Sequence, residues 1–307
     1  MGSLDRSAKK LIKENAVFAD AMNVFGYQGR KVIKPEYLSD TDSVHTIVIN
    51  GKERKKTYGK ERYRDAVKKV SIPGKNKCVC MITGFENQTK MNRAMPVRNM
   101  LYDAMLYTEQ VEEKSDCDNN SVITDLPDGE KILPVMTVVI NYGTEPWTAP
   151  RTLHELLDTD DRELLRNIPD YRINVMDPHT MSDEEIEKFE TNLREVFYCI
   201  KYTRDKERLY EVIKENEDRF RSITLNAKNV IENISSLKIK SNGKGGYNMC
   251  EAIEGIKADA KIEGIKEGIK EGIKEGRNKM IDALRVNGAS EELIQATLRT
   301  LEENKDK

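Results

Sequence analysis

The sequence predicts an α/β (α+β) fold, in which a mixed central β-sheet is flanked by helices and followed by a helical C-terminal tail. Three observations predict this fold. Amphipathic spacing indicates a helix over residues 7–24. Two strands, 61–70 and 77–86, are expected to form a hairpin around Pro73-Gly74. The nearly continuous apolar, β-branched run at 131–143 is typical of a central strand that is buried on both faces.

The other elements follow from local patterns along the chain. Residues 33–60 are mixed, with a strand at HTIVIN and a turn at Asn50-Gly51. Apolar residues recur at helical spacing after Pro96, which suits the first turn of a helix. A further strand is expected at YRINVMDP, and long helices are expected from 183 to 220. This order of elements gives one mixed sheet with helices packed on it.

Composition divides the chain into a core domain and a tail. Apolar residues concentrate before about residue 235, so we expect a domain at 1–235, a glycine-rich linker at 236–250 and a helical tail at 251–307. The tail repeats EGIK, and a four-residue period moves the Ile stripe about 40° around a helix with each repeat. Such a stripe indicates that the tail associates with another copy of itself. A flexible charged spacer is an equally good interpretation of the tail.

The overall composition indicates a protein of the cytoplasm. Of the 307 residues, 38% are hydrophobic and 34% are charged, which excludes wholesale disorder. No run approaches the ~18 apolar residues of a membrane helix, and the N-terminal region lacks the apolar segment of a secretory signal. Of the five cysteines, Cys78 and Cys80 share a strand face, but no second Cys/His pair at zinc spacing accompanies them. We therefore expect the cysteines to pack in the core.

Positive charge is concentrated in one stretch of the chain. Residues 52–77 hold eleven Lys or Arg against three acids, although the net charge of the chain is −2. Such a patch can contact the phosphates of DNA. The candidate DNA-binding residues are Lys55, Lys56, Lys60, Arg62 and Arg64. On charge alone, a solvated strand rim is the simpler interpretation.

A carboxylate and an amide end the second strand of the hairpin. Glu86 and Gln88 are two residues apart, so they share one face of the strand. Asp65 is expected near the middle of the preceding strand, where the hairpin can bring it beside Glu86. Adjacent carboxylates repel each other unless a cation separates them, and hydrated Mg²⁺ is commonly held by one or two carboxylates. The group either caps the sheet or forms part of an active site.

Several segments together resemble a known bacterial family. They are NAVFADAMN, RYRDAVKK, GFENQTKMNRAMPVRNMLYDAMLY, ILPVMTVVINYGTEPW, LHELL, YRINVMDP and GGYNMCEAI. The sequence resembles, over about residues 8–255, the recombination-promoting nuclease or putative transposase family, of PD-(D/E)XK nuclease type. The resemblance implies a restriction-endonuclease-like sheet flanked by helices and a nuclease that uses Mg²⁺ or Mn²⁺. The block ENQT…MPVR…YDA…Y is the most specific part.

The resemblance also implies roles for individual residues. Asp65 corresponds to the Asp of the motif and Glu86 to its second acid, and both would hold the metal. Gln88 stands where this superfamily most often has Lys, so it could orient the attacking water but supplies no charge. Arg64 stands in place of the motif's Pro. The accessory candidates are Asp20 on the first helix and Arg98, Tyr102 and Gln110 on the helix that follows the motif.

The sequence therefore favours one function and keeps a second open. The first is a Mg²⁺-dependent (or Mn²⁺-dependent) DNA endonuclease linked to recombination or mobile DNA, with the tail forming a homo-oligomer. The second is a catalytically inactive module that binds nucleic acid or oligomerises and retains the acids for packing. A third interpretation makes the tail a partner-binding arm. No separate transposase triad is visible, so transposition is implied by the family name alone.

Overall fold

The computed structural model describes residues 2–41, 44–49, 58–63, 65–74, 79–114, 125–235, 237–243 and 245–303. Within these ranges, only the backbone is described for 44–49, 58–63, 79–87, 256–264 and 299–303. The chain forms two compact units, Met1–Glu251 and Ala252–Lys307. The candidate site belongs to the first unit.

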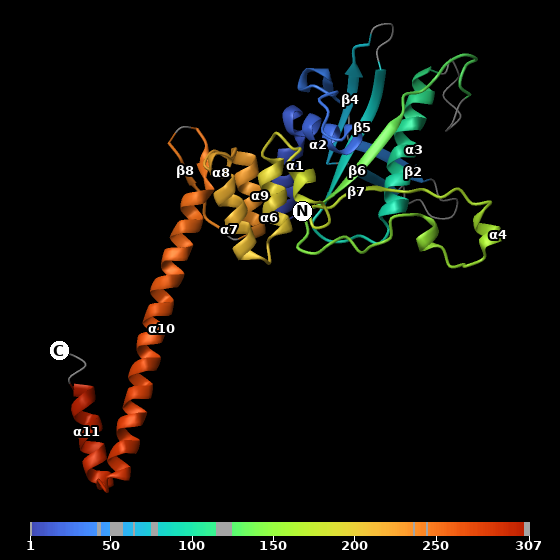
Figure 1. Ribbon diagram of the computed structural model, residues 1–307. Helices are drawn as coiled ribbons and strands as arrows, with labels where there is room; N and C mark the ends of the chain where they lie inside the picture. The colour runs from blue at the N-terminus through green and yellow to red at the C-terminus, as the bar shows by residue number, and fades with distance from the viewer. Residues whose placement is uncertain are drawn as a thin grey trace. The chain divides into compact units, whose positions relative to one another are not determined.

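A five-stranded mixed sheet lies at the centre of the first unit (Figure 1). Its strands, in spatial order, are β1 (Leu38–Asp40), β4 (Ala66–Ile72), β5 (Val79–Gln88), β6 (Val135–Asn141) and β7 (Asn174–Met176). β1, β4 and β5 are antiparallel neighbours, whereas β5, β6 and β7 run parallel. Val138, Val139 and Ile140 of β6 are fully buried, as expected of a central strand. The structure confirms the predicted mixed α/β class.

The strand predicted at 61–70 is wrong, because the chain bends within it. β3 (Tyr58–Tyr63) pairs with β2 (Val44–Ile49) in a separate two-stranded sheet, whereas β4 pairs with β1 and β5. Asp65 lies at the bend between β3 and β4. It therefore precedes β4 and does not lie in the middle of a strand.

Helices cover both faces of the sheet. These helices are α1 (Ser3–Lys13), α2 (Asn15–Tyr27) and α3 (Met95–Lys114). Val67 of β4 packs against Leu106 of α3, whereas the next residue, Lys68, lies 5.7 Å from the ring centroid of Phe18 in α2. Successive strand residues point to opposite faces, so α2 and α3 lie on opposite sides of the sheet (Figure 1).

The single helix predicted at 7–24 is two helices. Glu14 has an extended backbone (φ −62°, ψ 125°) and separates α1 from α2. The break lets α1 pack on α9 and on the ends of β4 and β5, while α2 remains over the sheet. α2 ends at Gln28 and Gly29, which both have positive φ (57° and 87°).

The long helices predicted between 183 and 220 are shorter helices joined by tight turns. They are α5 (Asp183–Ile186), α6 (Leu193–Lys201), α7 (Lys206–Glu215) and α8 (Glu217–Phe220), and α9 (Leu225–Ser235) follows them. α6 carries the apolar face of this layer, since Val196, Phe197 and Ile200 are buried. Short helices also occur in loops: η1 (Pro35–Tyr37), η2 (His154–Leu156) and α4 (Arg162–Leu165).

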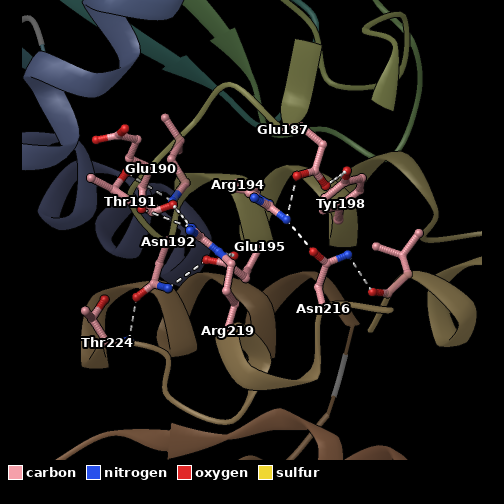
Figure 2. Close-up of polar contacts among 12 residues, drawn as sticks. Glu187, Glu190, Thr191, Asn192, Arg194, Glu195, Tyr198, Asn216, Arg219 and Thr224 are labelled. Carbon is pink, nitrogen blue, oxygen red and sulfur yellow. Dashed lines mark hydrogen bonds and ion pairs between the residues drawn. The ribbon is translucent and has the colours of Figure 1, made fainter. Parts of the chain in front are cut away.

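A polar network joins these helices (Figure 2). Glu195 of α6 is fully buried and accepts a hydrogen bond from Nε of Arg219 at 2.6 Å. Asn192 donates to the other carboxylate oxygen of Glu195 at 2.7 Å. Arg219 also donates to the carbonyls of Glu190 and Thr191, at 3.0 and 3.1 Å. Through Asn192 and Arg219, the loop before α6 and the helix α8 are both bonded to the same buried carboxylate.

The stretch expected to be a linker, 236–250, is largely folded. Within it, β8 (Lys240–Ser241) and β9 (Tyr247–Asn248) form a two-stranded ribbon. Ile239 and Met249 are buried, and Tyr247 pairs with Ile223 in an isolated bridge. The glycines thus belong to a tight turn of this ribbon, where Gly243 and Gly245 have positive φ.

The second unit consists of helix. α10 (Met249–Val286) begins in the first unit and continues through the EGIK repeats, and α11 (Glu291–Glu303) follows the turn at Gly288, whose φ is 77°. Ile265, Ile269 and Ile273 are 50–58% exposed in the structure of this chain. Of the described helices, none is long and apolar enough to cross a membrane.

Candidate functional site

The candidate site lies at the sheet edge where the parallel strands β5 and β6 end and β4 begins. Ala66 of β4 pairs with Phe85 of β5, so one further step of this register places Asp65 opposite Glu86. Gln88 is the last residue of β5 and is buried. Asp65 precedes the first paired residue of β4, and Glu86 and Gln88 belong to the end of β5, so the backbone of these three positions lies at one end of the β4–β5 pair. The side chain of Glu86 is outside the described residues.

A cation from the N-terminal helix reaches Asp65. Nζ of Lys9 lies 3.7 Å from Oδ1 of Asp65, and the two side chains are 24% and 12% exposed. Asp5 lies four residues before Lys9, on the same face of α1. Its Oδ1 accepts a 2.6 Å hydrogen bond from the hydroxyl of Thr89, which directly follows Gln88. α1 is thus bound to the end of β5 through Asp5 and presents Lys9 to Asp65.

Tyr142, directly after β6, adds a buried hydroxyl to the same edge. Its backbone N–H donates to the carbonyl of Gln88 at 2.7 Å. The side chain is 1% exposed, and its hydroxyl has no hydrogen-bond partner in the described part of the chain. Burial and the negative charge of Asp65 both raise the pKa of Tyr142, so the hydroxyl keeps its proton. A buried hydroxyl without a partner is a group that a ligand or water can satisfy.

Three contacts fix the alignment of α3 against β6. They are Leu133 N–H to Gln110 (2.6 Å), Val135 N–H to the hydroxyl of Tyr107 (3.0 Å) and the Thr137 hydroxyl to Asp103 (2.6 Å). Each step takes three or four residues of helix and two residues of strand. The helix rises about 4.5–6 Å per step and the strand about 6.6 Å, which are similar distances.

The next step of this alignment brings Asn99 to the level of Val139. Asn99 is fully buried, and neither atom of its carboxamide has a hydrogen-bond partner among the described residues. Val139 is the register partner of Glu86 in β5. A second unsatisfied polar side chain therefore lies at the level of the motif acid.

A neighbouring polar cluster at the ends of β6 and β7 is fully bonded. Asp177 accepts from the amide of Asn141 at 3.0 Å and from the backbone N–H of Trp147 at 2.7 Å. Nε2 of His179 is 2.9 Å from the carbonyl of Gly143. The cluster holds the loop after β6 in place, and its polar groups already have partners.

The accessory candidate Asp20 anchors a loop. Its carboxylate accepts the backbone N–H of Glu190 at 3.0 Å and both the N–H and the hydroxyl of Thr191, at 2.8 and 2.7 Å. Burial raises the pKa of Asp20, and these hydrogen bonds offset only part of that effect. Among the acids of the N-terminal helices, Asp5, through its bond to Thr89, is the one joined to the end of β5.

The candidates on α3 occupy two different ends of that helix. Arg98 donates from Nε to the hydroxyl of Tyr102 at 2.9 Å, and its guanidinium lies 5.5 Å from the Tyr102 ring centroid. Both belong to the first half of α3, near the sheet edge of the site. Gln110 bonds to Leu133 through both ends of its amide, so it aligns the start of the β6 segment.

The basic stretch is described only in part. Lys60 and Arg62 lie on β3, paired with residues 47 and 45 of β2. Lys55, Lys56 and Arg64 lie outside the described residues. Lys68 is buried and donates to Asn15 and to Asp40, at 2.6 Å each.

The described residues contain no group of three or more His, Cys, Asp or Glu that could hold a metal ion. The side chains of Cys199 and Cys250 are described, and both are buried thiols. Burial raises the pKa of the Cys199 thiol, which makes it an inert packing group, as expected. A site for a hydrated metal would need fewer protein ligands, and Asp65 with Glu86 could provide them.

Sequence reasoning missed four residues at this edge. Asp5 and Lys9 have the i,i+4 spacing of one helix face, which was the available signal. Tyr142 and Asn99 carry no local signal, because a Tyr after a strand and an Asn in a helix are ordinary. Their burial without a partner is visible only in the structure.

Comparison with known proteins places the chain in a family. No curated protein and no solved structure matches it. A family model described as "Putative transposase, YhgA-like" matches residues 60–230, which include β4, β5, α3, β6 and β7. Because this match covers more than half of the chain, the chain belongs to the family described in these words.

Proposed function

We propose that this protein is a metal-dependent endonuclease that hydrolyses phosphodiester bonds in DNA, with a restriction-endonuclease-like core. One observation carries the proposal: the β4–β5 register ends with Ala66 opposite Phe85, so its next step would set Asp65 opposite Glu86, two residues from Gln88, at one sheet edge. The order helix, antiparallel strands, helix and parallel strand supports the proposed core. Family membership supports DNA as the partner.

The residues present fit a hydrated Mg²⁺ or Mn²⁺. Carboxylate oxygens are the ligands these ions take in proteins, and one or two of them suffice when water and phosphate complete the shell. Asp65 and Glu86 would hold the ion. The partnerless hydroxyl of Tyr142 near Asp65 gives a buried donor for a water or phosphate oxygen. When bound, the ion neutralises charge on the phosphate and lowers the pKa of a bound water.

The side chains divide the work of hydrolysis. Gln88 accepts or donates a hydrogen bond and so orients the attacking water. The water oxygen forms a bond to phosphorus, one ester P–O bond breaks, and that oxygen leaves as an alcohol after gaining a proton, while the water loses one to solvent. The products are a phosphate monoester and a hydroxyl end. The basic stretch at 52–77 would hold the phosphates on either side.

Plasmid nicking tests the proposal. Purified protein is incubated with supercoiled plasmid and Mg²⁺ or Mn²⁺, beside Asp65→Asn and Glu86→Gln, which keep the side-chain shapes. Asp128→Asn is the matched control, because Asp128 is an exposed acid on a turn remote in sequence from the motif. We expect metal-dependent nicking that both motif variants abolish and the control retains.

The opposite result would identify a different function. If wild type and both variants bind DNA equally and none nicks it with any divalent metal, the acids are a structural cap. The protein would then be a nucleic-acid-binding module without catalysis. Thermal unfolding of each variant serves as the folding control, because a variant that no longer folds would also stop nicking.

We also propose that the tail joins copies of the chain. Ile265, Ile269 and Ile273 recur every four residues, and their side chains are 50–58% exposed. The surface beside Gly268 and Gly272 is open, since a Cβ added at either residue would meet no atom within 4 Å in the described chain. Each Gly lowers the stability of the helix by ~1 kcal/mol. Replacing the three Ile with Glu in the full-length protein should lower its mass measured by light scattering. An unchanged mass would exclude this assembly route.

A further inference from the structure

A cation beside the motif acid Asp65 comes from the N-terminal helix α1, far from the motif in sequence. Gln88 is uncharged, and the motif positions 65, 86 and 88 contain two acids and an amide. A phosphodiester brings one further negative charge to this edge. Lys9 forms an ion pair with Asp65, with 3.7 Å between Nζ and Oδ1.

The structure positions Lys9 firmly enough for it to act there. α1 packs along α9 and against β4 and β5. Ala8, Leu11 and Ile12 of α1 are fully buried, so the helix cannot rotate without exposing them. Asp5 fixes its first turn to Thr89, next to Gln88. Lys9 is therefore presented by a packed helix, and it remains partly exposed, so it can meet a ligand at the edge.

We infer that α1 is part of the catalytic site and that Lys9 supplies the positive charge that Gln88 lacks. The inference rests on the proposed nuclease function. The Lys9 ammonium lies beside Asp65 and offsets the negative charge that builds up on the phosphate during attack by water. α1 lies outside the residues that the family model matches, so the match does not assign this role.

The alternative is that Lys9 only holds α1 on the sheet. A structural ion pair and a catalytic cation differ in what they do to a metal. A positive charge next to a metal ligand weakens binding of the metal, so removal of the charge should tighten it. A purely structural Lys9 would, when removed, loosen α1 and weaken or leave unchanged the binding of metal.

Four full-length variants test the inference: Lys9→Gln, Lys9→Arg, the double variant Lys9→Gln/Gln88→Lys, and Lys10→Gln as the control. Lys10 is the adjacent, exposed lysine of the same helix. Single-turnover nicking is measured with Mg²⁺, and Mn²⁺ affinity is measured by calorimetry without DNA.

We expect Lys9→Gln to slow nicking about 100-fold, the loss typical of one charge-stabilising group. Its Mn²⁺ affinity should rise about two- to fivefold, as for removal of one partly exposed like charge. Lys9→Arg should keep most of the activity. In the double variant, Gln88→Lys should restore part of the activity that Lys9→Gln removes. Lys10→Gln should change neither the nicking rate nor the Mn²⁺ affinity.

Two results separate the inference from the nuclease proposal. If wild type nicks, Asp65→Asn does not, and Lys9→Gln nicks within threefold of wild type, the inference is overturned and the nuclease stands. If wild type never nicks, the nuclease proposal fails. In that case weaker or unchanged Mn²⁺ binding by Lys9→Gln overturns the inference as well, whereas tighter binding supports the placement of Lys9 at the metal ligand.

Discussion

The ion pair between the fully buried Glu195 and the one-third-exposed Arg219 gives the sharpest stability prediction. Glu195 is fully buried, and its carboxylate has two partners, Arg219 at 2.6 Å and Asn192 at 2.7 Å (Figure 2). Arg219→Met removes the cation and keeps much of the side-chain volume. Glu195 then retains one neutral hydrogen-bond donor while its charge stays out of water.

The expected cost is that of a broken buried pair, about 3–5 kcal/mol. In a domain of this size, each kcal/mol lowers the melting temperature by roughly 2–4 °C, so Tm should fall by about 6–20 °C. The loss should be larger than that of an exposed pair such as Arg221 with Glu217, where Arg221→Met should cost below about 1 kcal/mol.

Thermal unfolding followed by circular dichroism measures the effect, and the double variant Arg219→Met/Glu195→Gln tests its cause. Removing the uncompensated charge should restore most of the lost stability, because a buried pair contributes little relative to neutral groups of similar shape. If Arg219→Met costs no more than Arg221→Met, or if the double variant is as unstable as the single one, the reasoning is refuted.

Two further predictions concern other polar groups in the first unit. Asn99→Leu should raise Tm by about 2–12 °C, because an unsatisfied buried polar group costs ~1–3 kcal/mol, and it should lower nicking if Asn99 serves the site; a lower Tm would contradict this. Asp183 is paired with Lys201 and Arg208, and although burial raises the pKa of Asp183, hydrogen bonds from these cations and Tyr202 outweigh it, so its pKa is lowered. A lowered pKa adds stability that is present at neutral pH and lost as the pH falls through the folded-state value. Asp183→Asn should therefore destabilise the protein at pH 7. Its effect should shrink as the pH falls below about 4, the ordinary pKa of Asp, and vanish below the lowered folded-state pKa. An effect that stays constant from pH 7 down to the acid limit of folding, measured by urea unfolding, would count against it.

Features with a short-range physical cause were predictable from the sequence. Val135–Asn141, within the apolar run at 131–143, became β6 because continuous β-branched residues suit a strand covered on both faces. β4 and β5 pair in antiparallel register, as the predicted hairpin requires, and the end of that register at Ala66 and Phe85 leaves Asp65 and Glu86 next in line. Likewise, the i,i+2 spacing of Glu86 and Gln88 is fixed by the backbone of one strand.

Periodicity failed where two segments had to serve different neighbours. The apolar pattern at 7–24 is continuous, yet the chain breaks at Glu14 so that α1 can pack on α9 while α2 covers the sheet. The run 61–70 is equally continuous, yet the bend at Asp65 divides it between two sheets. Local patterns describe which face is apolar, and they do not say which surface will cover it.

The sequence by itself determined the class of the fold, the family and the motif of two acids and an amide on one hairpin. Only the tertiary structure decided which other groups join them. Asp20, the accessory candidate on α2, is bound to a loop 170 residues away in the chain. Asp5 bonds to Thr89, 84 residues away, and so brings Lys9 to Asp65. These pairings follow from how the buried faces of whole helices pack, and the side chains at the polar edge are placed by that packing.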